Sequence, residues 1–129
     1  MQPRTPQPIV TQDAPTPKAA YSQGIDAGVL VMVSGQLGVD PSTGEIPDDV
    51  GNETRLVMNH IRAVLAAANL SMDDVCKTTI FMTNFEDYGT VNEVYGEYFE
   101  TLPARSTVKV AELLMGARVE IEAIAVRRS

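Results

Sequence analysis

Hydrophobic positions change their period along this chain, and each change predicts a new element of secondary structure. Short runs ahead of the first turn-rich segment and on either side of a second one predict strands at 9–11, 21–23 and 29–34. The last two are joined by Gly24-Ile25-Asp26-Ala27-Gly28, which is typical of a hairpin, and the residues from 35 to 44 are expected to be loop.

From about Asp49 to Asn69 the spacing becomes helical. Val57, Ile61, Val64 and Leu65 recur at i, i+4, i+7 and i+8, which is one face of a helix. A strand at 75–83, a second helix at 88–99 and two strands at 104–112 and 117–127 follow. This order predicts a single α+β domain over residues 9–129, a one-layer sheet carrying two helices on one face. Residues 1–8 are expected to be a disordered, proline-rich tail.

The last two predicted strands alternate between apolar and polar positions. Val119, Ile121, Ala123 and Ala125 share one face, and Glu120, Glu122, Ile124 and Val126 share the other. In the preceding strand Val108 and Val110 alternate with Arg105 and Thr107. If both apolar sets face the helices, Arg105, Thr107, Glu120 and Glu122 lie together on the opposite face. Because that face also carries apolar residues, we expect a second copy of the chain to cover it and the site to lie at the interface.

Arg105 and Glu120 carry the chemical argument. A guanidinium group holds a carboxylate through two parallel hydrogen bonds, and a nearby glutamate can move protons at the bound molecule. The pair therefore predicts a site for a small carboxylate substrate. A structural salt bridge between the same two residues is the alternative.

Composition limits the classes of molecule that this chain is expected to bind. The 129 residues carry a net charge of −7, which disfavours nucleic acid. The longest apolar run, Val29 to Val33, is far too short to span a bilayer. A single cysteine, Cys76, fits a reducing compartment, and with one histidine it makes no zinc site. We therefore expect a cytoplasmic protein without a metal, a membrane or a nucleic-acid partner.

Seven segments in order resemble the RidA/YjgF/YER057c/UK114 family over nearly all of residues 9–128. They are Tyr21-Ser22-Gln23-Gly24, Val33-Ser34-Gly35-Gln36, Asp40-Pro41-Ser42-Thr43-Gly44-Glu45, Lys77-Thr78-Thr79-Ile80-Phe81, Val91-Asn92-Glu93-Val94-Tyr95, Pro103-Ala104-Arg105-Ser106-Thr107-Val108 and Val119-Glu120-Ile121-Glu122-Ala123-Ile124-Ala125. The resemblance implies a chorismate-mutase-like α+β fold and a homotrimer around a central barrel, with clefts between subunits. It also implies hydrolysis of reactive enamines and imines, such as 2-aminoacrylate, to 2-keto acids and ammonia, without a cofactor or metal.

The same resemblance implies roles for individual residues. Arg105 would clamp the substrate carboxylate, and Glu120 would orient or activate the attacking water, helped by Thr107. Ser34 and the backbone of Gly35 would line the cleft and hydrogen-bond the imino nitrogen. Tyr21 would close over the substrate, and Asn92 would support the pocket from the second helix.

The chain departs from the family pattern at three places. Ala19-Ala20 stands where relatives usually have Gly-Pro, Thr107 stands where they often have cysteine, and the link from Phe99 to Pro103 is short. Two alternative functions stay open: a non-catalytic trimer that binds small carboxylates, for which Arg105 alone would suffice, and an endoribonuclease, which the acidic charge disfavours.

Overall fold

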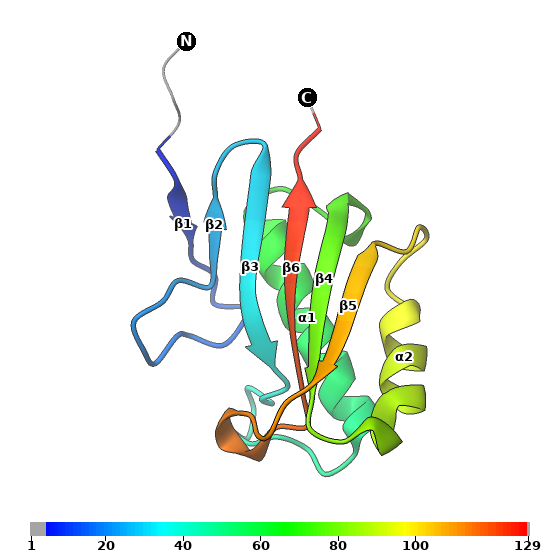
Figure 1. Ribbon diagram of the computed structural model, residues 1–129. Coiled ribbons are helices and arrows are strands. Elements are labelled where there is room, and N and C mark those ends of the chain that lie inside the picture. Colours follow the sequence, from blue (N-terminus) through cyan, green and yellow to red (C-terminus); the bar gives the residue numbers. More distant parts are fainter. Residues whose placement is uncertain (1–4, 129) are drawn as a thin grey trace.

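The structure, a computed structural model, describes residues 5–128 and contains a sheet of six strands in the order β1-β2-β3-β6-β4-β5 (Figure 1). The strands are β1 (Gln7–Ile9), β2 (Gly24–Asp26), β3 (Leu30–Leu37), β4 (Val75–Met82), β5 (Ala104–Lys109) and β6 (Val119–Val126). The helices are α1 (Val50–Ala67) and α2 (Tyr88–Gly96), and short 3-10 turns occupy Met72–Asp74, Phe85–Asp87 and Leu114–Gly116.

The sheet is antiparallel except for its last pair. β4 and β5 are parallel neighbours, and α2 is the crossover that a parallel pair requires. β6 lies between β3 and β4 and pairs antiparallel with both. The final strand in the sequence is therefore an interior strand of the sheet.

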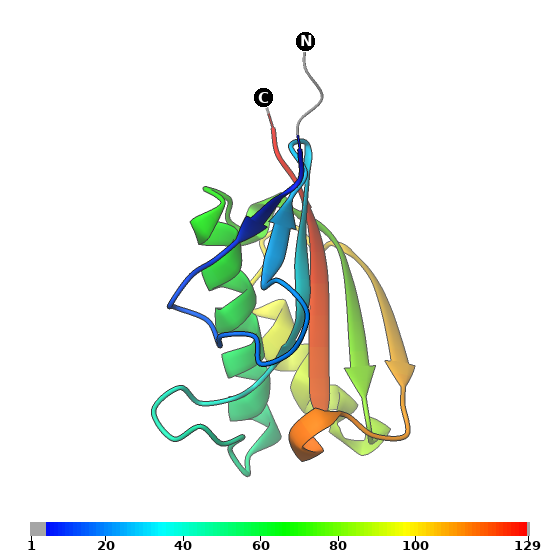
Figure 2. The same cartoon turned by 90° about the vertical axis from the view of Figure 1, so that its left-hand side faces the viewer.

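Both helices cover one face of the sheet, and no helix covers the other in the described part of the chain (Figure 2). The expected α+β layer arrangement is confirmed. Residues that face away from the helices include apolar side chains from four strands, namely Leu30, Met32, Phe81, Val108, Ile124 and Val126. We name this surface the open face. Neither helix is long and apolar enough to cross a membrane.

The first helix forms as its spacing predicts. Asp49 caps its N-terminus, where the side-chain Oδ1 accepts hydrogen bonds from the backbone N–H groups of Gly51 and Asn52 at 2.7 and 3.1 Å. The expected apolar face is fully buried and packs on the central strands to form the core. After the helix ends, Asn69 takes a positive φ of 62°, a conformation that asparagine tolerates.

Two expectations for the N-terminal half are wrong. Residues 21–23 are not a strand but lead into β2, and the buried Gln23 side chain bonds the backbone of Thr11, Ala14 and Pro15. Residues 35–37 are not loop but the end of β3, where Gln36 pairs with Ile121 after a β-bulge.

The sheet also begins earlier than expected. β1 starts at Gln7 and includes Pro8, which an edge strand tolerates. Gln7 and Pro8 are thus not part of a disordered tail, and residues 1–4 of that tail lie outside the described residues.

A buried ion pair joins α1 to the start of β6. Glu53 is fully buried, and its carboxylate accepts from the backbone N–H of Arg118 at 2.8 Å and from Arg118 Nε at 2.7 Å. The same guanidinium donates to the carbonyl oxygens of Pro47 and Asp48. Gly38 lies so close to the Glu53 carbonyl that a Cβ would overlap it. The cluster therefore fixes the beginning of β6 relative to α1.

Arg118→Ala should strongly destabilise the protein, because it leaves the Glu53 carboxylate buried without its charged partner. We expect the free energy of unfolding to fall by about 3 kcal/mol or more, measured by urea denaturation. Arg55→Ala is the matched control, since Arg55 and Glu97 form an exposed pair at 3.4 Å. Equal denaturation midpoints for the two variants would contradict the assigned role.

Candidate active site

Arg105 is fixed by aromatic and polar side chains of α2. Its Nη1 donates to Asn92 Oδ1 at 2.8 Å, and its Nη2 donates to the Tyr88 hydroxyl at 2.6 Å. The guanidinium carbon lies 5.1 Å from the ring centroid of Tyr95 and 5.5 Å from that of Tyr88. Tyr88, Asn92 and Tyr95 follow one another at i, i+4 and i+7, so a single helix face presents all three to β5.

A pocket of about 290 Å³ opens beside this arginine. Asn92, Tyr95, Gly96, Leu102, Pro103 and Arg105 line it, between the end of α2 and the start of β5. A guanidinium group has five N–H donors, and Asn92 and Tyr88 use two of them. Three donors therefore remain for an anion, and the rigid fork matches a carboxylate.

Glu120 lies on β6 against the bulge of β3. The backbone at Gly35 is so close to the Glu120 carboxylate that a Cβ there would overlap it. Only glycine fits at position 35 while the carboxylate keeps this position. Burial raises the pKa of Glu120, and the neighbouring charge of Glu122 raises it further. A partly buried glutamate with a raised pKa is suited to proton transfer.

The expectation that Arg105 and Glu120 share one face is wrong. Arg105 pairs with the buried Thr78 of β4 and points to the helix side, whereas Glu120 pairs with Phe81 on the open face. Thr107 pairs with the buried Ile80 and also points to the helix side. The physical reason is that β5 is an edge strand whose orientation is set by pairing with β4, not by its own apolar residues.

Within one chain the two residues are also separated along the sheet. β4 lies between their strands, so the strands are about 10 Å apart, and the side chains point in opposite directions. None of the ion pairs among residues 5–128 joins Arg105 to Glu120. The structure therefore does not support the structural salt bridge that was the alternative.

Ser34 and Tyr21 belong to a third part of the predicted site. The Ser34 hydroxyl donates to the carbonyl oxygen of Ser22 at 2.5 Å, and its backbone N–H donates to the carbonyl of Gln23 at 3.0 Å. Ser34 thus anchors the segment that carries Tyr21, whose side chain is 54% exposed. Its hydroxyl proton is used within the chain, and the oxygen remains able to accept a hydrogen bond from a ligand.

Sequence reasoning missed Tyr88 and Tyr95. The signal that would have found them is the i, i+4, i+7 spacing with Asn92, which was the helix residue singled out. Tyr95 is buried, and its hydroxyl lies 2.6 Å from Thr78 Oγ1. Thr78 is the residue of β4 that pairs with Arg105 in the sheet.

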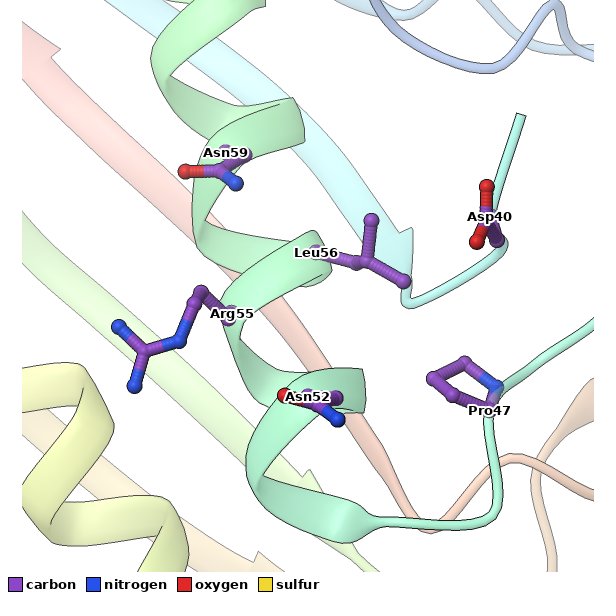
Figure 3. A pocket seen from close by; sticks show the side chains of 6 residues that line it. All are labelled: Asp40, Pro47, Asn52, Arg55, Leu56 and Asn59. Atoms are coloured by element: carbon purple, nitrogen blue, oxygen red, sulfur yellow. The ribbon is translucent and has the colours of Figure 1, made fainter. Parts of the chain in front are cut away.

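A separate pocket of about 300 Å³ lies on the outer side of α1, lined by Asp40, Pro47, Asn52, Arg55, Leu56 and Asn59 (Figure 3). Arg55 points away from Asp40 and Pro47 in this view, toward α2, where Glu97 accepts its hydrogen bonds. None of the predicted site residues lines this pocket. Residues 5–128 also contain no group of three side chains arranged to hold a metal ion.

Known proteins resemble the chain over almost its whole length. The 2-iminobutanoate/2-iminopropanoate deaminase of Escherichia coli K12 is 44% identical over 124 residues, covering 93% of this chain and 97% of that protein. The RutC family protein PH0854 of Pyrococcus horikoshii is 45% identical, covering 91% and 94%.

Solved structures agree with the sequence relatives. The crystal structure of Escherichia coli TdcF with bound serine superposes with a TM-score of 0.92 at 46% identity, covering 95% of this chain and 99% of that one. The structure of the Escherichia coli YjgF gene product gives a TM-score of 0.90 at 43% identity, covering 95% and 99%.

The family model described as endoribonuclease L-PSP matches residues 11–127. Together with the deaminase and YjgF relatives, this match covers the segments on which the resemblance was first noted. The chain belongs to the RidA/YjgF/YER057c/UK114 family.

Proposed function

We propose that this chain is a deaminase that hydrolyses reactive 2-imino acids and their enamine tautomers to 2-keto acids and ammonia. The observation that carries the proposal is the fixed guanidinium of Arg105, with three donors left beside an open pocket. Relatives named as 2-iminobutanoate/2-iminopropanoate deaminases support the same reaction.

The chemistry needs few groups. Arg105 holds the substrate carboxylate, which places the electrophilic imino carbon at a fixed distance from the protein. A water oriented by Glu120 forms the new C–O bond, the C=N electron pair moves to nitrogen, and Glu120 accepts a proton from the water. The protonated Glu120 then returns this proton to the amine nitrogen of the tetrahedral adduct. As the C–N bond breaks and ammonia leaves with the bonding pair, the hydroxyl of the adduct gives its proton to Glu120 and the keto group forms.

The separation of Arg105 and Glu120 on opposite faces supports a site built from two copies of the chain. We propose that a homotrimer brings Arg105 of one copy to Glu120 of a second, with the open faces packed around a central barrel. Leu30, Met32 and Val108 on the open face are 45, 37 and 41% exposed in the single chain, and such packing would bury them.

An endoribonuclease is disfavoured, although the family model carries that description. The net charge is −7, and the single histidine, His60, is buried with its Nε2 2.9 Å from the carbonyl of Val39. Burial lowers the pKa of His60, and its ring is committed inside the fold. The acidic charge and single Cys76 support a cytoplasmic protein that acts on small molecules.

Arg105→Ala should abolish the acceleration of imine hydrolysis, since the substrate carboxylate loses its clamp. The measurement couples a pyridoxal-phosphate dehydratase that generates 2-aminoacrylate to the release of the keto acid, with and without this protein. Arg62→Ala is the control, because Arg62 lies over the ring of Tyr98 and has no contact with the pocket. Wild-type protein that fails to accelerate any 2-imino acid would contradict the deaminase.

Glu120→Gln should lower kcat by roughly 10²–10⁴-fold while leaving keto-acid binding intact, because the amide cannot accept the proton. In the wild type, kcat/KM should fall as the pH is lowered. Since the pKa of Glu120 is raised above the ordinary 4.5 and the base must be ionised, the fall begins at a higher pH than for an exposed glutamate. Full activity in Glu120→Gln would instead favour the carboxylate-binding function or a different base.

Mixing the two inactive variants should restore activity if each site uses two copies. In trimers refolded from equal amounts of Arg105→Ala and Glu120→Gln, about a quarter of the sites combine an intact arginine with an intact glutamate. The recovered rate is compared with wild-type protein refolded in parallel. If each site lies within one chain, every site keeps a defect and the mixture stays inactive.

A further inference from the structure

Tyr88 contacts Arg105, and the proposed function gives its hydroxyl no contact with the substrate. It is the first residue of α2, and its hydroxyl oxygen lies 2.6 Å from Arg105 Nη2. The residue is 42% exposed and lies at the surface beside the guanidinium. Phe85 packs edge-on against the ring, with centroids 6.4 Å apart and planes at 88°. The phenol is therefore held in one place beside the clamp.

The Tyr88 hydroxyl is not the only contact that positions Arg105. Asn92 accepts from the other terminal nitrogen at 2.8 Å, and the buried Tyr95 ring lies 5.1 Å from the guanidinium carbon. Tyr95 is itself bonded to Thr78 of β4, which pairs with Arg105 in the sheet. These contacts define the arginine conformation from two sides without Tyr88.

The phenol keeps an unused donor. A tyrosine hydroxyl has one O–H donor and can accept at its oxygen. The oxygen accepts from Arg105 Nη2, and the O–H hydrogen has no acceptor among residues 5–128. An anion that binds the guanidinium next to Nη2 lies within reach of this hydrogen, and charge-assisted O–H···O⁻ bonds are short and strong.

We propose that Tyr88 is a substrate-binding residue whose hydroxyl donates a hydrogen bond to the carboxylate held by Arg105. The carboxylate then receives hydrogen bonds from the guanidinium and the phenol together. The identity of the ligand as a 2-imino acid or 2-keto acid rests on the proposed function, whereas the carboxylate recognition rests on the contacts of Tyr88 alone.

Tyr88→Phe tests this proposal, because it removes the hydroxyl and keeps the ring. We expect the Kd for 2-oxobutanoate, measured by titration calorimetry, to rise about tenfold or more, as expected for a lost bond to a charged group. KM for the corresponding imino acid should rise by the same factor, with kcat unchanged, because the bond is present in both ground and transition states. A structural role would change kcat or the thermal unfolding midpoint instead.

Tyr98→Phe is the matched control. Tyr98 also donates through its hydroxyl, to Asn59 Oδ1 at 2.8 Å, but it has no contact with Arg105. We expect this variant to bind 2-oxobutanoate like the wild type. Wild-type affinity in Tyr88→Phe, or equal weakening in both variants, would overturn the proposal. If the wild type shows no deaminase activity while Tyr88→Phe still weakens 2-oxobutanoate binding, the reaction is wrong and the role of Tyr88 stands.

Discussion

A side chain on a β-strand can point to only one face of its sheet, and this constraint governs the site of this protein. Arg105 points toward α2, and Glu120 points away from both helices. No rotation of either side chain brings the two groups together through a sheet that is one strand thick. Within one chain, Arg105 and Glu120 therefore cannot act on the same small molecule, and this is why the proposed site needs a second copy of the chain.

The alternation along β6 divides the strand between two tasks. Its buried positions, Val119, Ile121, Ala123 and Ala125, join the core beneath α1. Between them Glu120 and Glu122 face the other way, so the same eight residues stabilise the fold and present the acid. The Glu53–Arg118 pair fixes the start of this strand two residues before Glu120. Arg118, which binds Glu53 on the helix side, and Glu120, which faces away from the helices, are thus only two residues apart.

The sequence predicts the parts of the fold that depend on local periodicity. Both helices and the four longest strands follow from the spacing of apolar residues, and the helix face at Val57 and Ile61 is buried as expected. The orientation of β5 does not follow, because an edge strand with exposed Val108 has no apolar face that marks the helix side. That orientation is decided by parallel pairing with β4, a contact between segments joined only through α2.

The candidate site was predictable to a similar extent. Motifs identified Arg105 and Glu120 because their residue types carry the chemistry. Tyr88 escaped because a tyrosine at the start of a helix is equally typical of packing, and only the position of its hydroxyl relative to Arg105 reveals a donor. The Ser34 hydroxyl donates to the Ser22 carbonyl, a contact that no local pattern indicates, and its role toward a ligand stays a prediction.

The interior position of β6 has a consequence for biosynthesis. A ribosome makes β3, α1 and β4 before β6, yet β3 and β4 meet only through that strand. Until it emerges, the apolar face of α1 has only part of its partner surface, and two strand edges stay unpaired. Folding of the nascent chain must therefore wait for its last strand, and prematurely terminated chains would leave these edges open to chaperones and proteases.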